Sequence, residues 1–363
     1  MRYTIAEIAN ALEAEAVGDT SMVVTGLSEP GQAGPEDLAL ASNAKYAGSI
    51  AAGAAKAALL WDGADWEELG LNAAVLPQRP RFAMSQLTTM ADPGQGFGSG
   101  IHPSAVVDPT ARIGDDVTIA AGAVVGPDAE IGDGSIIGPL CFVGWRASLG
   151  PNAYLREHVS IGAGVRIGAN FIAQPGVRIG GDGFSFVTPE KSGVEAVRES
   201  LGDQGEASGQ PWARIASLGA VFIGDDVEVG SNTVIDNGTI RPTTVGDRTK
   251  IDNLVHIGHN CVIGEDNLLC GCVGLAGSVT VGNFVVMAGQ VGVSDNLTIG
   301  NNVVLAAASK VLSSVRDGKV MMGYPATEMK TNLDIFKNTR RLTRVLRDVA
   351  ELKKAVFKSN AND

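Results

Sequence analysis

The chain has 363 residues, which is long enough for two domains and one large core. Its 28 basic and 40 acidic residues give a formal net charge of -12, which argues against general nucleic-acid binding because phosphate recognition needs a concentrated basic surface. Only 5% of the residues are aromatic and 47 are glycines, a composition that favours a repetitive β architecture with small aliphatic core residues. The four cysteines are too few for a disulfide framework.

The N-terminal residues predict a small α/β domain. The run TIAEIANALEAEA is helical in character, and KAALLW and NAAVLP are short apolar stretches. The start lacks the basic segment and apolar run of a secretory signal, and no later stretch has about 18 consecutive apolar residues. We therefore expect a cytoplasmic protein without an integral membrane segment. The segment ADPGQGFGSG predicts a linker, so that this domain and its linker span residues 1–100.

A period of six residues dominates the middle of the chain. From Ile101 to Ile179, thirteen of the fourteen residues at this spacing are branched aliphatics, and the period resumes at Ile223 and runs to Val311 after one shift of frame. A short strand followed by a turn, repeated, explains this spacing, whereas helical or simple strand periodicity does not. The sequence thus predicts a parallel β-helix over residues 101–322, with 18-residue triangular coils stacked about 4.8 Å apart.

Two segments interrupt the period. Residues 181–219 are polar and rich in glycine, and we expect an excursion loop of the kind that often covers a site. The stretch NGTIRPTT around Arg241 adds four residues between coils.

Residues 323–363 predict a helical C-terminal extension. Apolar residues recur every seven positions, which indicates a short coiled coil and hence an oligomer; they are Ile335, Leu342, Val349 and Val356. The remaining faces carry an excess of Lys and Arg. This excess is either a solvated helix face or a docking surface for an acidic partner.

The stretch IDNLVHIGHNC holds His256 and His259, two of the four histidines, and the repeat register points both outward. They could form a metal site, a catalytic base with its neighbour, or part of a solvated face. A zinc site needs at least three ligands, and His102 and His158 lie coils away, although a neighbouring subunit could supply one.

One coil beyond His259 the register reaches Gly277, whose backbone N–H no side chain would cover. An imidazole beside an accessible amide suits acyl transfer, because the ring can act as the base and the N–H can hold the developing oxyanion. A further coil leads to Asp295, beside Asn296.

The run from Val221 to Cys261, with GGDGFSF before it and CGCVGLAGSVTVG after it, resembles the UDP-3-O-(3-hydroxyacyl)glucosamine N-acyltransferases of lipid A biosynthesis. The resemblance covers nearly the whole chain, and KIDNLVHIGHN is its most specific block. It implies a left-handed β-helix and a homotrimer with active sites between subunits. It also implies transfer of an (R)-3-hydroxyacyl chain from the phosphopantetheine of acyl carrier protein to the 2-amino group of the UDP-sugar, with no metal and no other cofactor.

The resemblance also assigns roles to single residues. His259 matches the general base, Gly277 the oxyanion donor, and Asp252 with Asn253 a preceding polar pair, of which Asp252 would orient or support the imidazole. His256 matches a neighbour of the base, where many relatives carry Gln.

In the N-terminal domain, LALASNAKY is similar to the family's uracil-binding segment, which gives Asn43 a hydrogen-bonding role and Tyr46 a stacking role. Three positions depart from the family pattern. Leu40 replaces a usual second aromatic, Asn237 replaces a usual Arg, and Asn296 takes the place of a second histidine at the substrate site.

Two other activities stay open at this point. One is an acetyl-CoA-dependent sugar-nucleotide acyltransferase. The other is a β-helix without acyltransferase activity, either a structural scaffold or a carbonic-anhydrase-like shell with a metal.

Overall fold

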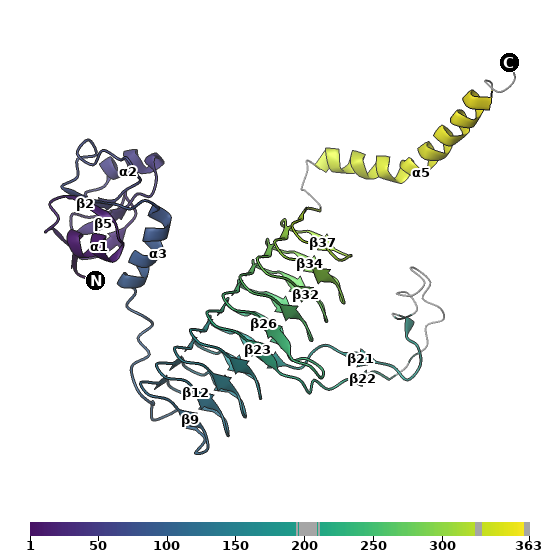
Figure 1. Cartoon of the computed structure of the whole chain (residues 1–363), viewed down its shortest axis with the longest axis horizontal. Coiled ribbons are helices and arrows are strands. Elements are labelled where there is room, and N and C mark those ends of the chain that lie inside the picture. The colour runs from purple at the N-terminus through teal and green to yellow at the C-terminus, as the bar shows by residue number, and fades with distance from the viewer. Residues whose placement is uncertain (194, 196–208, 210, 324–328, 359–363) are drawn as a thin grey trace. The chain divides into compact units, whose positions relative to one another are not determined.

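The computed structural model describes residues 1–193, 195, 209, 211–323 and 329–358. The chain divides into two compact units, Met1–Gly96 and Phe97–Asp363 (Figure 1). The boundary between them falls inside the Gly-rich segment that the sequence predicts as a linker.

The N-terminal unit is built on a five-stranded sheet in the order β2-β7-β6-β5-β4, parallel except for the β2–β7 pair. Two apolar clusters form its core, one including Ile5 and Leu87 and the other including Ile50. The α/β character expected from the sequence is therefore present. Its elements are β1 Tyr3–Thr4, α1 Ile5–Ala11, β2 Glu15–Gly18, β3 Val23–Val24, β4 Gly26–Ser28, β5 Asp37–Leu40, the 3-10 helix η1 Ala44–Tyr46, α2 Ala47–Ala52, β6 Ala57–Leu59, β7 Ala73–Leu76 and α3 Pro80–Ala91.

The second unit is a parallel β-solenoid whose coils each place one short strand in each of three sheets (Figure 1). The first sheet holds β8 Val106–Val107, β11 Val124–Val125, β14 Phe142–Val143, β17 Ser160–Ile161, β20 Arg178–Gly181, β25 Val234–Asp236, β28 His256–Ile257, β31 Gly274–Leu275, β34 Gly292–Val293 and β37 Lys310–Val311. The second holds β9 Arg112–Ile113, β12 Glu130–Ile131, β15 Ser148–Leu149, β18 Arg166–Ile167, β23 Val221–Ile223, β26 Thr243–Val245, β29 Val262–Ile263, β32 Thr280–Val281 and β35 Thr298–Ile299. The third holds β10 Thr118–Ile119, β13 Ile136–Ile137, β16 Tyr154–Leu155, β19 Ile172–Ala173, β24 Glu228–Val229, β27 Lys250–Ile251, β30 Leu268–Leu269, β33 Val286–Met287, β36 Val304–Leu305 and β38 Val320–Met321.

The coil length and the inward residues confirm the predicted repeat. Ile119 pairs with Ile137 and Ile137 with Leu155, so each step has the predicted coil length, and all three side chains are fully buried. Each such burial stabilises the fold by about 1.5–3 kcal/mol relative to an exposed side chain. Ile101 is 53% exposed although it has the inward phase, because it begins the stack and no coil covers it from below.

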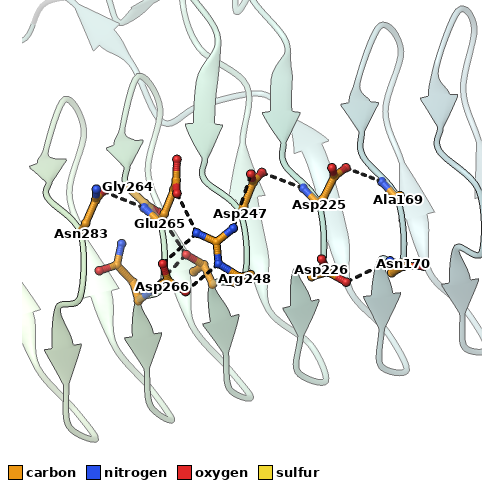
Figure 2. A network of polar contacts seen from close by, with 12 residues as sticks. Ala169, Asn170, Asp225, Asp226, Asp247, Arg248, Gly264, Glu265, Asp266 and Asn283 are labelled. Atoms are coloured by element: carbon orange, nitrogen blue, oxygen red, sulfur yellow. Dashed lines mark hydrogen bonds and ion pairs between the residues drawn. The ribbon is translucent and has the colours of Figure 1, made fainter.

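Polar side chains at one corner of the solenoid tie each coil to the next (Figure 2). The Ala169 N–H donates to Asp225 Oδ1 at 2.7 Å, and the Asp225 N–H donates to Asp247 Oδ1 at 2.9 Å. Further along, the Glu265 N–H donates to Asn283 Oδ1 at 2.9 Å. These bonds satisfy backbone amides that the corner would otherwise leave without a partner.

Both predicted interruptions are present, and they fall in consecutive coils. The step from β20 to β25 runs from Arg178 to Val234, and the next step, to β28, runs from Val234 to His256, so both exceed the regular coil. The longer excursion contains an antiparallel hairpin of β21 Phe186–Val187 and β22 Ala213–Arg214, which extends away from the coils in Figure 1. The shorter one contributes the four extra residues expected around Arg241.

The C-terminal extension is helix α5, Met329–Lys358, in agreement with the helical pattern of the sequence. Its predicted apolar repeat is solvent-exposed in the single chain, with Ile335 53% and Leu342 51% exposed. In the described part of the chain, no helix has the length and apolar character needed to cross a membrane.

Candidate active site

A cavity of about 830 Å³ lies between the excursion hairpin and the coils that follow it. The solenoid wall is polar and contributes Asp236, His256 and His259. The hairpin wall is aromatic and contributes Phe184, Phe186 and Trp212. The cavity therefore offers titratable groups and an apolar surface to one ligand.

His259 and Gly277 lie against each other across neighbouring coils. The pairing of β28 with β31 places His256 opposite Gly274, so that each residue of this corner stacks on its counterpart one coil later. A Cβ added to Gly277 would lie 2.6 Å from both Cε1 and Nε2 of His259, closer than real Cβ contacts. The Nε2 edge of the imidazole thus faces the glycine, which is the juxtaposition that the repeat register predicts.

The Gly277 N–H has no acceptor among the described residues. At the corner shown in Figure 2, the residues that correspond to Gly277 are Asp225 and Glu265. Their N–H groups donate to the side chains of Asp247 and Asn283, which lie one coil later. Here the residue one coil on is Asp295, and its carboxylate instead accepts from Ser294 Oγ at 3.3 Å and Asn296 Nδ2 at 3.1 Å. The glycine amide is thereby left available to a ligand in the cavity.

Hydrogen bonds around the Asn260 side chain fix the tautomer of His259. Its Nδ1 lies 3.0 Å from Asn260 Oδ1. That oxygen also accepts from the Thr239 N–H at 3.2 Å and the Thr239 hydroxyl at 2.9 Å, while Asn260 Nδ2 donates to the Arg241 carbonyl at 3.2 Å. The partners therefore settle the amide orientation, and Nδ1 must be the protonated ring nitrogen. Nε2 is left as the free base in the neutral ring.

Gly183, at the start of the excursion, packs on the other side of His259. A Cβ at Gly183 would lie 2.7 Å from the His259 Cβ and 3.1 Å from its Cγ. The Gly183 N–H donates to Ser217 Oγ at 3.0 Å, which joins the two arms of the excursion at this point. The imidazole is thus held between two glycines, because no larger residue would allow either backbone to approach so closely.

Asp236 is a buried acid beside both histidines. Its side chain is only 8% exposed, and its Oδ2 lies 3.7 Å from His256 Nε2. Burial raises the pKa of the Asp236 carboxyl, whereas the positive charges of His256 and His259 act in the opposite direction. Asp182 adds a further raising effect on this pKa.

Asp252 and His259 lie at different corners of the coil. Asp252 follows β27 at one corner, whereas His259 follows β28 at the next corner, and no hydrogen bond joins the two side chains. Asp252 Oδ1 accepts from the Asn253 N–H at 2.7 Å, and Asn253 Oδ1 accepts from the Ser231 N–H at 2.6 Å. The chain turns a corner between the two residues, and the supporting role that the family resemblance gives Asp252 stays a prediction. Within the chain, the hydrogen-bond partner of His259 Nδ1 is Asn260 Oδ1.

The other predicted residues divide between the two units. His256 and Asn296 line the cavity with His259 and Gly277. Asn43 and Tyr46 belong to the N-terminal unit, where Asn43 Oδ1 accepts from the Lys45 N–H at 2.9 Å at the start of η1. The uridine-binding roles of Asn43 and Tyr46 stay predictions.

Several residues that line the cavity or lie next to it received no role from the sequence. Asn237, noted in the sequence for its identity alone, has a buried Oδ1 without a hydrogen-bond partner among the described residues, while its Nδ2 donates to the Gly180 carbonyl at 3.0 Å. Its neighbour Asp236 was not identified, although an acid directly after the inward Ile235 was a usable signal. The aromatic side chains and Asn260 gave no periodic signal, because their positions depend on the two interruptions.

Across the portion of the chain described here, no three His, Cys, Asp or Glu side chains gather closely enough to hold a metal ion. The paired Cys270 and Cys272 are half-buried and exposed, respectively, and both are free thiols.

Comparison with known proteins agrees with the fold. A family model described as bacterial transferase hexapeptide (six repeats) matches residues 110–144 and 242–277. A crystal structure of the UDP-N-acetylglucosamine acyltransferase from Arabidopsis has a TM-score of 0.51 and 24% sequence identity, covering 62% of this chain and 71% of that one. This likeness shows the fold alone. Together with the repeat, the family match identifies the second unit as a β-solenoid of the hexapeptide repeats found in bacterial transferases.

Two curated relatives narrow the assignment. The UDP-3-O-acylglucosamine N-acyltransferase of Ruegeria pomeroyi is 60% identical over 363 residues, the whole of both chains. The enzyme of the same name from Paracoccus denitrificans is 57% identical over 358 residues, 99% of this chain and 98% of that one. The chain belongs to the UDP-3-O-acylglucosamine N-acyltransferase family.

Proposed function

We propose that this acyltransferase moves an (R)-3-hydroxyacyl chain from acyl carrier protein to the 2-amino group of UDP-3-O-(3-hydroxyacyl)glucosamine, a step of lipid A biosynthesis. His259 is the general base. The observation that carries the proposal is the pairing of a free Nε2 on His259 with the Gly277 N–H, which has no acceptor in the described part of the chain.

In the proposed reaction, the neutral amine attacks the thioester carbonyl carbon, so that a C–N bond forms and the carbonyl oxygen becomes an oxyanion. The Gly277 N–H donates to this oxyanion. His259 Nε2 takes the proton that the nitrogen loses, and Asn260 Oδ1 stabilises the resulting imidazolium through Nδ1–H. The C–S bond then breaks, and the imidazolium returns the proton to the departing thiolate. The products are an amide and the free thiol of the carrier.

The two walls of the cavity suit the two reactants. Phe184, Phe186 and Trp212 supply apolar surface for a hydrocarbon chain, and Phe184 is 84% exposed. The polar wall with His256 and His259 suits a sugar amine. No cofactor besides the phosphopantetheine of the donor is needed for this chemistry.

The remaining partners belong to the same proposal. Asn43 and Tyr46 bind the uracil of the UDP-sugar, and three chains assemble as a homotrimer in the cytoplasm. Helix α5 carries exposed cations, among them Arg340, Arg344 and Arg347, which would attract the acidic carrier protein. Raising the ionic strength should then raise KM for the carrier, and a KM that does not change with salt would contradict this docking surface.

Loss of His259 tests the reaction itself. His259→Ala should keep the fold and lose about 10² to 10⁴ in kcat, because the base is gone. The matched control is His158→Asn, an exposed histidine several coils away at φ 60°, a conformation that Asn tolerates. Near-normal turnover by the His259 variant would overturn the assignment.

The donor is tested with the intact protein and a purified UDP-3-O-acylglucosamine acceptor. Carriers loaded with hydroxyacyl chains of different length should each be compared with acetyl-CoA, and mass spectrometry identifies the product. Transfer from acetyl-CoA alone would favour the acetyl-CoA-dependent alternative, and transfer from neither donor would favour a non-catalytic β-helix.

A further inference from the structure

Within the described part of the chain, the Asp236 carboxylate lacks the hydrogen bonds that a buried acid usually has. Its side chain is 8% exposed, yet its polar contact there is His256 Nε2 at 3.7 Å, beyond hydrogen-bond distance. It lines the cavity that also contains His259. A desolvated carboxylate without close donors is expensive to ionise, so a positively charged ligand group placed against it would be strongly favoured.

Asp295, the other acid described on the solenoid wall of the cavity, differs from Asp236 in its hydrogen bonds. Asp295 has its carboxylate engaged by Ser294 Oγ at 3.3 Å and by Asn296 Nδ2 at 3.1 Å, and its side chain is only half-buried. Asp236 therefore stands out as the acid whose acceptor capacity is left for a ligand.

The groups facing Asp236 come from two strands and the turns that follow them. His256 lies on β28, His259 follows the same strand at the corner, and Asp182 follows β20. Asp182 has an ion pair of its own with Arg214 at 3.9 Å. His256 Nε2 is beyond hydrogen-bond distance of the Asp236 carboxylate, so the acceptor capacity of this carboxylate is open to a ligand in the cavity.

We propose that Asp236 binds the acceptor amine in its ammonium form and places the nitrogen beside His259. This inference rests on the proposed function and specifies how the site selects an amine. The ammonium loses one proton to solvent before attack, and the resulting neutral amine loses its second proton to His259 Nε2. A hydroxyl acceptor carries no positive charge, so the carboxylate favours an amino sugar over its hydroxy counterpart.

The test compares two ligands by direct binding, without turnover. One is UDP-3-O-acylglucosamine, and the other is the matched UDP-3-O-acylglucose with a hydroxyl at the 2-position. Calorimetric titrations without acyl donor are run with the wild-type protein and with Asp236→Asn. Each is done at one pH below and one pH above the pKa of the ligand's amine. The matched control is Asp116→Asn, an exposed acid at φ 54°, which Asn tolerates.

We expect Asp236→Asn to weaken binding of the amino sugar about 10- to 100-fold where the amine is protonated, the range of one charged hydrogen bond. Binding of the hydroxy analogue should change less than about twofold. Equal weakening of both ligands, or no weakening of the amino sugar, would overturn the proposal, because Asp236 would then support the fold or the His256 ring alone.

A second variant keeps the test decisive if Asp236→Asn is poorly folded. His256→Gln removes the imidazole beside Asp236 and retains the carboxylate, so the preference for the amino sugar should persist or increase. Loss of that preference would also overturn the proposal. Formation of the amide product by the wild-type protein tests the proposed reaction separately. The binding titrations can therefore overturn the role of Asp236 without contradicting N-acylation.

Discussion

His259 Nδ1 and Asn260 Oδ1 lie 3.0 Å apart, and this contact makes the neighbouring side-chain amide the hydrogen-bond partner of the imidazole within the chain. The same amide is held by Thr239 and by the Arg241 carbonyl, both in the four-residue insertion. The insertion therefore acts on the chemistry through one side chain.

Removal of this amide should damage catalysis more than substrate binding. Asn260→Ala takes away the acceptor that selects the tautomer, and we expect kcat to fall about 10- to 100-fold with little change in KM. The lost hydrogen bonds should also destabilise the fold by about 1–3 kcal/mol. Steady-state kinetics and thermal unfolding measure the two effects. Asn260→Asp is the companion variant, since it keeps an acceptor for Nδ1. A kcat within twofold of wild type for Asn260→Ala would contradict the role.

The approach of Gly277 to the imidazole predicts a sharp difference between two glycines of one turn. A methyl group at Gly277 would lie 2.6 Å from His259 Nε2, whereas one at Gly274 meets nothing within 4 Å among the described residues. Gly277→Ala should displace the ring and lower kcat about 100-fold or more, and Gly274→Ala should leave kcat within about twofold. Circular dichroism and kinetics of both proteins check this. Equal activities would show that the ring and this amide do not act together.

Asp236 should lower the stability of the fold at neutral pH. Burial raises its folded-state pKa above the ordinary value of 3.8, so ionisation destabilises the native state increasingly as pH rises through that folded pKa. We expect Asp236→Asn to raise Tm by about 2–4 °C at pH 7. The difference should vanish below the ordinary value, where both states are protonated. Melting curves from pH 3 to 8 test the sign, and a destabilised variant at pH 7 would show that the carboxylate is compensated.

Arg248 should stabilise the acidic corner shown in Figure 2, where it lies 2.7 Å from Glu265 and 2.8 Å from Asp266. Hydrogen bonds from Arg248 lower the pKa of Asp266, so this stabilisation is present above the ordinary carboxyl pKa and is lost as pH falls below it. We expect Arg248→Ala to lower Tm by about 2 °C at pH 7 in low salt. High salt or acid should abolish the difference. Differential scanning calorimetry measures it, and an unchanged Tm in low salt would contradict the role.

The sequence predicted the solenoid well because each coil repeats the same physical problem. Aliphatic residues at a regular spacing can all point inward when the chain forms a stack of equal coils. The stacking of His259 under Gly277 then follows from counting one coil length along the chain. Counting worked because no insertion separates these two residues.

The rest of the site was not predictable by counting. Phe184 lies in the longer excursion, and Asp236 lies where the pairing of β20 with β25 is irregular, and no period specifies either feature. Asp252 received its supporting role through the family resemblance, and that role stays a prediction because Asp252 and His259 lie at different corners of the coil.

The two insertions leave consecutive coils, while the coils on either side keep their pairing. Because a stacked repeat transmits strain mainly to its immediate neighbours, such segments can be lengthened or exchanged without refolding the remainder of the rod. Excursions grafted from relatives could therefore alter which acyl chains this enzyme accepts, while His259 and Gly277 stay in place.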